Sequence, residues 1–283
     1  MNQTTNFVVP QQIVTANITA AKGKTQLPLL RMILLGILAG MFIACGASAS
    51  SVAMHAISNV GLARLVAGCI FPVGLMMIVF VGGELFTGDC LMIMGCIHRK
   101  FSLLSMVKVL AVVWVSNLLG SVILAALVSA SGQFHYSGGL LGAFTIKVGL
   151  GKVSLNFGTA FVSGILCNIF VCIAVLMAAA AKDIVSKVFA IFFPILAFVV
   201  SGYEHCVANM YYIPAAIFAS ADPAYVQAAQ TAYGYTASQL ASLNWSSLLL
   251  NNLVPVTLGN IVGGMVFVGL PLYLIHSAKI REE

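Results

Sequence analysis

The sequence has few charged residues. Only 7% of its 283 residues are Asp, Glu, Lys or Arg, whereas 61% are hydrophobic, and the mean hydropathy is +1.06. A water-soluble domain of this length needs more charged side chains to cover its surface. Apolar runs of about 20 residues or more, long enough to cross the hydrocarbon core of a bilayer as α-helices, recur along the chain. The sequence therefore predicts an all-α integral membrane protein.

Two further absences exclude other features. The first residues contain no short basic region followed by an apolar core and a cleavage site, so we expect no signal peptide. The seven cysteines include no Cys-x-x-Cys pair and lie inside apolar segments, where cysteine acts as a small buried hydrophobe. We therefore expect no disulfide bond, no metal site and no cofactor.

Six membrane crossings can be placed on the apolar runs. Their predicted ranges are 29–54, 65–97, 105–131, 155–181, 187–220 and 246–276. Before them, apolar residues recur at near-helical spacing among polar ones, at Val9, Ile13, Val14 and Ile18. This predicts an amphipathic helix at the membrane surface. We therefore expect an N-terminal segment at residues 1–27, a six-helix transmembrane domain at 28–276 and a C-terminal tail at 277–283.

The basic residues predict the orientation. An even number of crossings places both termini on one side, and ten of the 13 Lys and Arg residues fall on that side. The three on the other side are Arg64, Lys147 and Lys152. Cytoplasmic loops carry the excess of positive charge, so both termini are expected in the cytoplasm. The net charge of +6 then describes mainly cytoplasmic loops, and we expect no nucleic-acid partner.

Polar residues interrupt the second and fifth runs, at "GGELFTG" (82–88) and "SGYEHCVAN" (201–209). Irregular backbone at membrane depth persists only where it is buried in protein or lines a cavity. Each run is therefore predicted to be a broken helix whose break faces inward. The first N–H groups after the breaks, near Thr87 and Cys206, would favour an anion. Glu84 and Glu204 can accept from these N–H groups, which we favour over a direct role with a substrate.

His205 can change its charge near neutral pH and could donate to an anion or exchange a proton with it. The alternative is a neutral histidine whose nitrogens are satisfied by nearby backbone. An ionisable group at the middle of a membrane costs about 2.5 to 3.5 kcal/mol, so we favour a functional role. Thr87 of the other break is its expected hydroxyl partner.

A weak internal repeat relates the two halves of the chain. "GILAG" (36–40) in the first run matches "GTAFVSG" (158–164) in the fourth, and "NLLG" (117–120) in the third matches "NIVG" (260–263) in the sixth. Three crossings separate equivalent positions, so the halves have opposite orientations. The predicted fold is an inverted 3+3 repeat of transmembrane helices with helices 2 and 5 broken.

Three motifs in order, "GGELFTG", "GILCNIFVCIA" (164–174) and "SGYEHCVANM" (201–210), resemble the signature segments of the formate/nitrite transporter family. The resemblance covers essentially the whole chain. It implies an aquaporin-like protomer with its own pore, a homopentamer, and a multi-pass protein of the bacterial inner membrane. It also implies transport in place of enzymatic activity.

The resemblance further implies roles for individual residues. The substrate pathway is expected at His205, Thr87, Asn168 and Lys152. Hydrophobic constrictions are expected at Phe71, Leu75, Leu85 and Phe198. The structure of the breaks is expected to depend on Glu84, Glu204 and Asn209. Asp89 departs from the pattern, because a small neutral residue is expected after the first motif.

The expected partners are a small anion of a weak acid, a proton, the lipid bilayer and further copies of the chain. Lys152 would attract the anion, and the apolar constrictions would oppose a bare charge because its desolvation is costly. The anion would cross as the neutral acid after gaining a proton at or near His205. Formate is the first expectation, followed by nitrite, with hydrosulfide and lactate left open.

Two alternatives lie outside this family. A neutral-solute channel of the aquaporin class shares inverted repeats and helix breaks, but the chain contains no "NPA". A membrane-embedded metal protein could use Glu204, His205, Cys206, Asp89 and Cys90. Adjacent residues point in different directions on a helix and form no common ligand face, which disfavours the metal protein.

Overall fold

The protein is described by a computed structural model that places residues 6–280, with side chains as far as residue 276. Within this range it is almost entirely helical. The first half contains α1 (Pro10–Thr25), α2 (Leu29–Met54), α3 (Val60–Ile70), α4 (Val73–Val81), α5 (Phe86–Asp89), η1 (Cys90–Met92), α6 (Ile93–Ile97) and α7 (Leu103–Ala130). A short turn, η2 (Gln133–His135), then leads to α8 (Leu140–Val153).

The second half also contains long and interrupted helices. It contains α9 (Phe157–Ala180), α10 (Ile184–Ser201), α11 (Cys206–Ala219), α12 (Pro223–Tyr233) and α13 (Ala237–Ala241). The last segment is continuous and consists of α14 (Trp245–Ser247), η3 (Leu248–Leu253), α15 (Val254–Val262), η4 (Gly263–Gly269) and α16 (Leu270–Ile280). Much of the predicted tail at 277–283 therefore continues α16, and the rest lies outside the described residues.

The six predicted spans are confirmed. Within the described residues, six helical segments are long and apolar enough to cross a membrane. The second span begins earlier than predicted, at Val60 and not near Leu65. Asn59 explains the difference, because its side chain accepts from the Leu62 N–H at 2.9 Å and begins the helix there. The chain is thus a multi-pass integral membrane protein.

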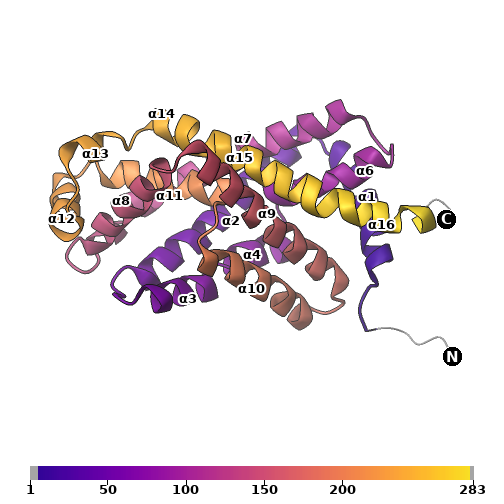
Figure 1. Ribbon diagram of the computed structural model, residues 1–283, viewed down its shortest axis with the longest axis horizontal. Helices are drawn as coiled ribbons and strands as arrows, with labels where there is room; N and C mark the ends of the chain where they lie inside the picture. The colour runs from indigo at the N-terminus through magenta and orange to yellow at the C-terminus, as the bar shows by residue number, and fades with distance from the viewer. Residues whose placement is uncertain (1–5, 281–283) are drawn as a thin grey trace.

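The long helices run between two ends of the molecule (Figure 1). The first and last helices, α1 and α16, lie at one end together with α6. The opposite end is formed by α8, α12 and α13. We call these the α1 end and the α8 end.

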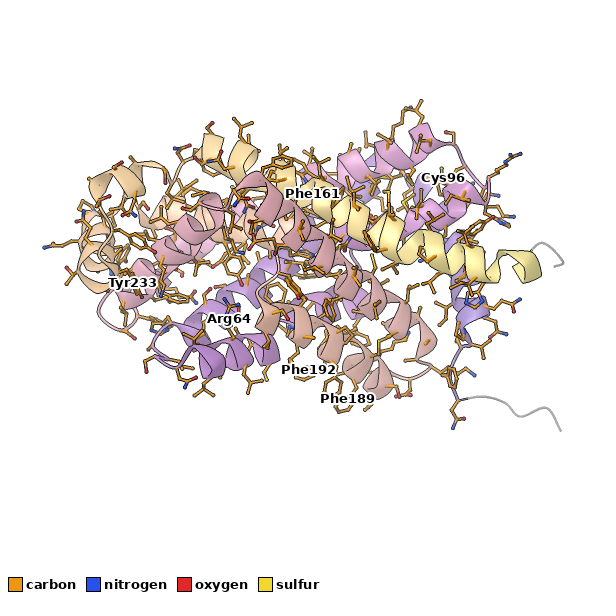
Figure 2. All side chains as sticks on the ribbon, in the orientation of Figure 1. Arg64, Cys96, Phe161, Phe189, Phe192 and Tyr233 are labelled. Carbon is orange, nitrogen blue, oxygen red and sulfur yellow. The ribbon has the colours of Figure 1, made fainter. Side chains whose placement is uncertain are left out.

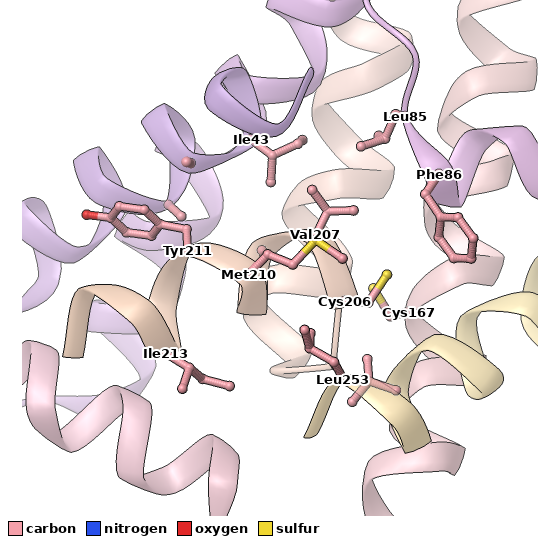
Figure 3. Packing of buried hydrophobic residues seen from close by; sticks show 14 of the residues in the cluster. Ile43, Leu85, Phe86, Cys167, Cys206, Val207, Met210, Tyr211, Ile213 and Leu253 are labelled. Carbon is pink, nitrogen blue, oxygen red and sulfur yellow. The ribbon is translucent and has the colours of Figure 1, made fainter. Parts of the chain in front are cut away.

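Glycines bring the long helices into close contact. A Cβ at Gly120 of α7 would lie 2.0 Å from the carbonyl oxygen of Ile37 in α2. A Cβ at Gly259 of α15 would lie 2.1 Å from the carbonyl oxygen of Phe161 in α9. Both helix pairs can therefore approach only because these positions lack a side chain. Between them, buried residues from α2, α5, α9, α11 and η3 form the core (Figure 3).

The N-terminal helix is present as predicted, but its apolar face is not open to lipid. Val14 and Ile18 are almost fully buried and pack against Leu91, Met94 and Tyr273. Helix α1 is therefore held on the α1 end of the bundle. The side chains that do face outward on the spans include Phe189 and Phe193 of α10, which are more than half exposed.

Candidate functional site

The first break lies between α4 and α5. Gly82 has a φ of +107°, a left-handed conformation that suits glycine, and α5 begins at Phe86. Asn117 of α7 fills the break. Its side chain accepts from the Phe86 N–H at 3.0 Å and donates to the carbonyl of Glu84 at 2.9 Å and to that of Gly36 at 2.8 Å.

The second break, between α10 and α11, has equivalent contacts. Gly202 has a φ of +74°, and Asn260 of α15 accepts from the Cys206 N–H at 2.9 Å. Asn260 also donates to the carbonyl of Glu204 at 3.0 Å and to that of Gly164 at 2.8 Å. Each break is therefore held by one asparagine with the same three kinds of partner. The opposite orientation of the two halves stays a prediction.

These contacts correct one expectation. We predicted that Glu84 and Glu204 accept from the free N–H groups after the breaks, but Asn117 and Asn260 occupy that position. Asparagine can do this and still donate to a carbonyl, which a carboxylate cannot. The two glutamates pair with lysines instead.

At the α1 end, Lys24 of α1 contacts two carboxylates. It donates to Glu84 and, at 2.5 Å, to Asp89, whose side chain is almost fully buried. Burial alone lowers the pKa of the Lys24 ammonium, but attraction to Asp89 and Glu84 outweighs it, so the pKa lies above its ordinary value. Lys24 therefore stays charged, and one ammonium faces two carboxylates. Asp89 Oδ2 has no hydrogen-bond partner among the described residues.

At the α8 end, Lys152 pairs with Glu204 at 2.8 Å. The other oxygen of Glu204 accepts from Asn209 at 2.6 Å, and Asn209 also donates to Asn252 at 2.8 Å. Asn209 follows Glu204 at the same spacing as Asp89 follows Glu84. The two ends thus have related lysine–glutamate pairs, with an amide at one end where the other has a carboxylate.

His205 and Thr87 meet at the centre, as the sequence analysis expects. Thr87 Oγ1 lies 3.0 Å from His205 Nε2, and both side chains are buried. His205 Nδ1 accepts from the Ala208 N–H at 3.0 Å, so the imidazole begins α11 as its N-cap. With Nδ1 acting as an acceptor, the ring proton belongs on Nε2 and the imidazole is neutral. Asn168 donates to the carbonyl of Thr87 at 3.2 Å and so supports the other half of the pair.

Two cavities approach this pair from opposite ends. The cavity at the α8 end has a volume of about 670 Å³, and its lining includes Phe71, Phe198, Lys152 and His205. We call it the α8-side vestibule. The cavity at the α1 end has a volume of about 320 Å³ and is lined by residues that include Lys24, Asp89, Leu75 and Leu85. We call it the α1-side vestibule. Among the described residues, none lines both cavities.

Buried apolar side chains line both vestibules. Phe71 and Phe198 contact each other edge to face, with ring centroids 5.5 Å apart, and the Phe198 ring lies 6.0 Å from that of His205. Leu75 and Leu85 are equally buried and lie toward the α1 side. Of the four residues expected to form constrictions, Phe71 and Phe198 thus line the α8-side vestibule, and Leu75 and Leu85 line the α1-side vestibule. Their role as constrictions stays a prediction.

The sequence profile of the formate/nitrite transporter family matches residues 11–274. The chain belongs to this family. It is 37% identical over 281 residues to a probable formate transporter of Methanothermobacter thermautotrophicus, a match that covers 93% of this chain and 95% of the relative. It is also 37% identical over 212 residues to the formate channel FocA of Haemophilus influenzae, covering 74% of this chain and 73% of the relative.

A solved structure described as a pentameric formate channel with formate bound is similar to the fold of this family member. The TM-score is 0.77 at 36% sequence identity, and the match covers 88% of this chain and 97% of that chain. The resemblance seen in the three sequence motifs is thereby confirmed.

Sequence reasoning missed three contributors to the site in this family member. Asn117 and Asn260 were used only as markers of the repeat, although their matched positions could have identified them as partners of the breaks. Lys24 was counted only as a cytoplasmic charge. It lies as far before Gly36 as Lys152 lies before Gly164, but the contacts of Asn117 and Asn260, and not the quoted repeat, relate these two glycines.

The metal alternative finds no support in the geometry. His205 uses both ring nitrogens, for Ala208 and Thr87. Between residues 6 and 280, His, Cys, Asp and Glu side chains form no group of three or more that could hold a metal ion.

Proposed function

We propose that this protein carries formate, or a closely similar small anion of a weak acid such as nitrite, across the bacterial inner membrane. The observation that carries the proposal is the buried His205–Thr87 pair between two separate vestibules. The formate transporter and formate channels to which the chain is similar support formate as the first substrate to test.

In the proposed pathway the anion enters the α8-side vestibule and reaches His205 past Phe71 and Phe198. A bare anion loses its hydration between these apolar side chains, which costs several kcal/mol even after partial compensation. A proton added to a carboxylate oxygen of the substrate removes the charge and most of this cost. The neutral acid then passes Leu75 and Leu85 and releases its proton in the α1-side vestibule.

The N-cap contact supports one specific contribution of His205. A proton on Nδ1 would break the hydrogen bond from the Ala208 N–H and leave that group without a partner, at about 1 to 3 kcal/mol. His205 therefore acts as a neutral donor through Nε2–H to an oxygen of the substrate. Thr87 gives up its contact with His205 and contacts the anion instead. Water in the α8-side vestibule relays a proton from the outside solution to the substrate, so that no hydroxide is left behind and His205 keeps its own proton.

The assembly and orientation follow the same proposal. We extend the pentameric arrangement of the similar formate channel to this chain, with one pore in each protomer. The α1 end faces the cytoplasm, because most of the basic residues lie there, and the α8-side vestibule faces outward. Native mass spectrometry tests the assembly, and a cysteine-labelling scan from each side tests the orientation.

Uptake of formate into proteoliposomes at two external pH values tests the function. Wild-type protein is expected to transport formate faster at the lower pH, because more substrate can be neutralised. Replacing His205 with Phe is expected to abolish this uptake, since Phe provides neither the Nε2–H donor nor the N-cap.

His205→Asn is the matched variant. Asparagine is a good N-cap, so it can still accept from the Ala208 N–H, but it has no imidazole. We expect it to retain the assembled protein and to lose at least nine-tenths of formate uptake. Undiminished, pH-dependent uptake by His205→Asn contradicts a role for the imidazole.

Substrate identity is tested with formate, nitrite, hydrosulfide and lactate compared in one proteoliposome preparation at both pH values. Formate and nitrite are expected to be transported fastest. Water and glycerol permeability measured by stopped flow on the same liposomes tests the aquaporin-class alternative. High glycerol permeability without anion flux would overturn the proposed function.

A further inference from the structure

The α8-side vestibule contains more positive charge than its lysine–glutamate pair indicates. All three basic residues predicted on that side of the membrane line the cavity: Arg64, Lys147 and Lys152. Lys152 is neutralised by Glu204 at 2.8 Å. Lys147 lies over the ring of Tyr233, with its nitrogen 4.5 Å from the ring centroid. Of these three, only Lys152 has a carboxylate within ion-pair distance among residues 6–280.

Arg64 lies on the α8 side of Phe71 and Phe198. It is on the same face of α3 as Ala67 and Phe71, and all three line the vestibule. Seven residues of helix correspond to about 10 Å, so the Cα of Arg64 lies roughly two turns from that of Phe71, toward the α8 end. An anion that enters the vestibule therefore meets Arg64 before it reaches Phe71 and Phe198.

The position of the guanidinium is set by the backbone that leads into the second break. Arg64 Nη1 donates to the carbonyl of Val200 at 3.5 Å, and a Cβ at Gly202 would lie 2.1 Å from Nη1. The left-handed φ of Gly202 favours glycine, and the Arg64 guanidinium fills the space beside it. Figure 2 labels Arg64 between α3 and α10, on the approach to the centre of the bundle.

Most of the hydrogen-bonding capacity of this guanidinium remains for a ligand. Arginine has five N–H donors in a planar fork, and the contact to Val200 uses one of them. The fork matches two oxygens held in a plane, as in a carboxylate or nitrite, with two parallel hydrogen bonds. Hydrosulfide presents a single acceptor atom and can use only one arm of the fork.

We propose that Arg64 forms an entry site in the α8-side vestibule that binds planar two-oxygen anions and favours them over single-atom anions. The site lies upstream of His205 and rests on the proposed transport function, since it selects the substrate before protonation. A general positive field, to which Lys147 contributes equally, would instead attract every small anion to the same extent.

The test uses full-length protein with Arg64→Gln, Arg64→Lys and Lys147→Gln. Arg64→Lys keeps the charge without the fork, and Lys147→Gln removes one charge from the same vestibule. Arg64 is exposed, so these variants are expected to fold, which size-exclusion chromatography verifies. Two quantities are measured at low ionic strength: the half-saturating concentration for uptake, and direct binding of formate, nitrite and hydrosulfide in detergent by titration calorimetry.

Arg64→Gln is expected to weaken formate and nitrite binding about five- to tenfold and hydrosulfide binding less than twofold, as the loss of one or two charge-assisted hydrogen bonds at a solvated site implies. Arg64→Lys is expected to bind hydrosulfide as tightly as the wild type does and to bind formate several-fold more weakly than the wild type. Lys147→Gln is expected to affect the three anions equally and by less than threefold.

Equal weakening of all three anions by Arg64→Gln, matching the effect of Lys147→Gln, would overturn the entry site and leave only a general field. Unchanged formate binding in Arg64→Gln would overturn it as well. The calorimetric measurement separates this proposal from the proposed function: absence of formate flux in the wild type refutes transport, whereas the binding differences report on Arg64 in either case.

Discussion

Replacing Asn117 with alanine is expected to lower the free energy of unfolding by about 3 kcal/mol. The side chain is fully buried and makes three hydrogen bonds of 2.8 to 3.0 Å. The carbonyl of Gly36 lies inside α2 and keeps its helical partner, so losing the hydrogen bond from Asn117 to this carbonyl costs little. The Phe86 N–H and the Glu84 carbonyl lie in the break, and Asn117 provides the contacts that satisfy them.

The magnitude follows from these two backbone groups. Each unsatisfied buried group costs about 1 to 3 kcal/mol. The lower end of this range, about 1 kcal/mol for each group, applies in a membrane protein, because the unfolded chain also finds hydrogen-bond partners. The cavity left by the amide adds about 1 kcal/mol. The equivalent contacts of Asn260 predict a similar loss for Asn260→Ala.

Ser121→Ala is the matched control for Asn117→Ala. Ser121 is one turn further along α7, is equally buried, and donates a single hydrogen bond of 3.2 Å to the carbonyl of Gly40. Its removal leaves no backbone group of a break without a partner, so about 0.5 to 1 kcal/mol is expected. Reversible unfolding in mixed detergent and SDS measures the three variants. A loss in Asn117→Ala no greater than in Ser121→Ala would refute the assignment of Asn117 as the residue that holds the break.

The remaining predictions concern ionisable residues outside the centre of the pore. Lys24→Met leaves the carboxylates of Glu84 and Asp89 without a counter-ion and is expected to lower stability by about 3 kcal/mol. Asp89→Asn keeps an acceptor for Lys24, so the free energy of unfolding is expected to change by no more than about 1 kcal/mol. Lys24→Met should then destabilise the Asp89→Asn protein less than it destabilises the wild type. An equal loss in both proteins contradicts the three-charge cluster. The pKa of Asp183 lies below its ordinary value because the Ser186 N–H and hydroxyl stabilise the charged carboxylate. The charged cap therefore stabilises the fold near neutral pH, and this stabilisation is lost as the pH falls below about 4 toward the lowered pKa. The difference in unfolding temperature between wild type and Asp183→Asn should therefore become smaller over that range in thermal unfolding scans.

The sequence was informative where polar residues interrupt apolar runs. Glu84 and His205 stand out against their neighbours, and irregular backbone at that depth must face inward, so the breaks could be located without a structure. The pairing of His205 with Thr87 followed from the same reasoning. The use of His205 Nδ1 as an N-cap could not be predicted, because imidazole is not among the usual capping groups and the contact depends on the local backbone direction.

The contacts of Lys24 were harder to predict for a different reason. Lys24 reaches Glu84 across 60 positions of sequence, and periodicity within a helix gives no information about contacts at that range. The partner of the apolar face of α1 could not be predicted from the sequence either. Val14 and Ile18 indicate that such a face exists, but lipid or protein could cover it equally well. Only the packing of α1 against Leu91 and Tyr273 distinguishes the two.

The two ends of the pathway differ in charge although their contacts are related, and the difference bears on the proposed transport. At the α8 end Lys152 and Glu204 balance each other, which leaves Arg64 and Lys147 to attract an anion. At the α1 end Asp89 stands where the other half has an amide, so Lys24 is outnumbered by two carboxylates. An anion is therefore favoured in the α8-side vestibule and disfavoured beside Asp89. An acid that crosses in the neutral form and ionises in the α1-side vestibule is repelled there, so its release is fast while its entry from that side is slow. The position of equilibrium still depends only on the gradients, because fixed charges change rates and local concentrations but not the free energies of the two bulk solutions.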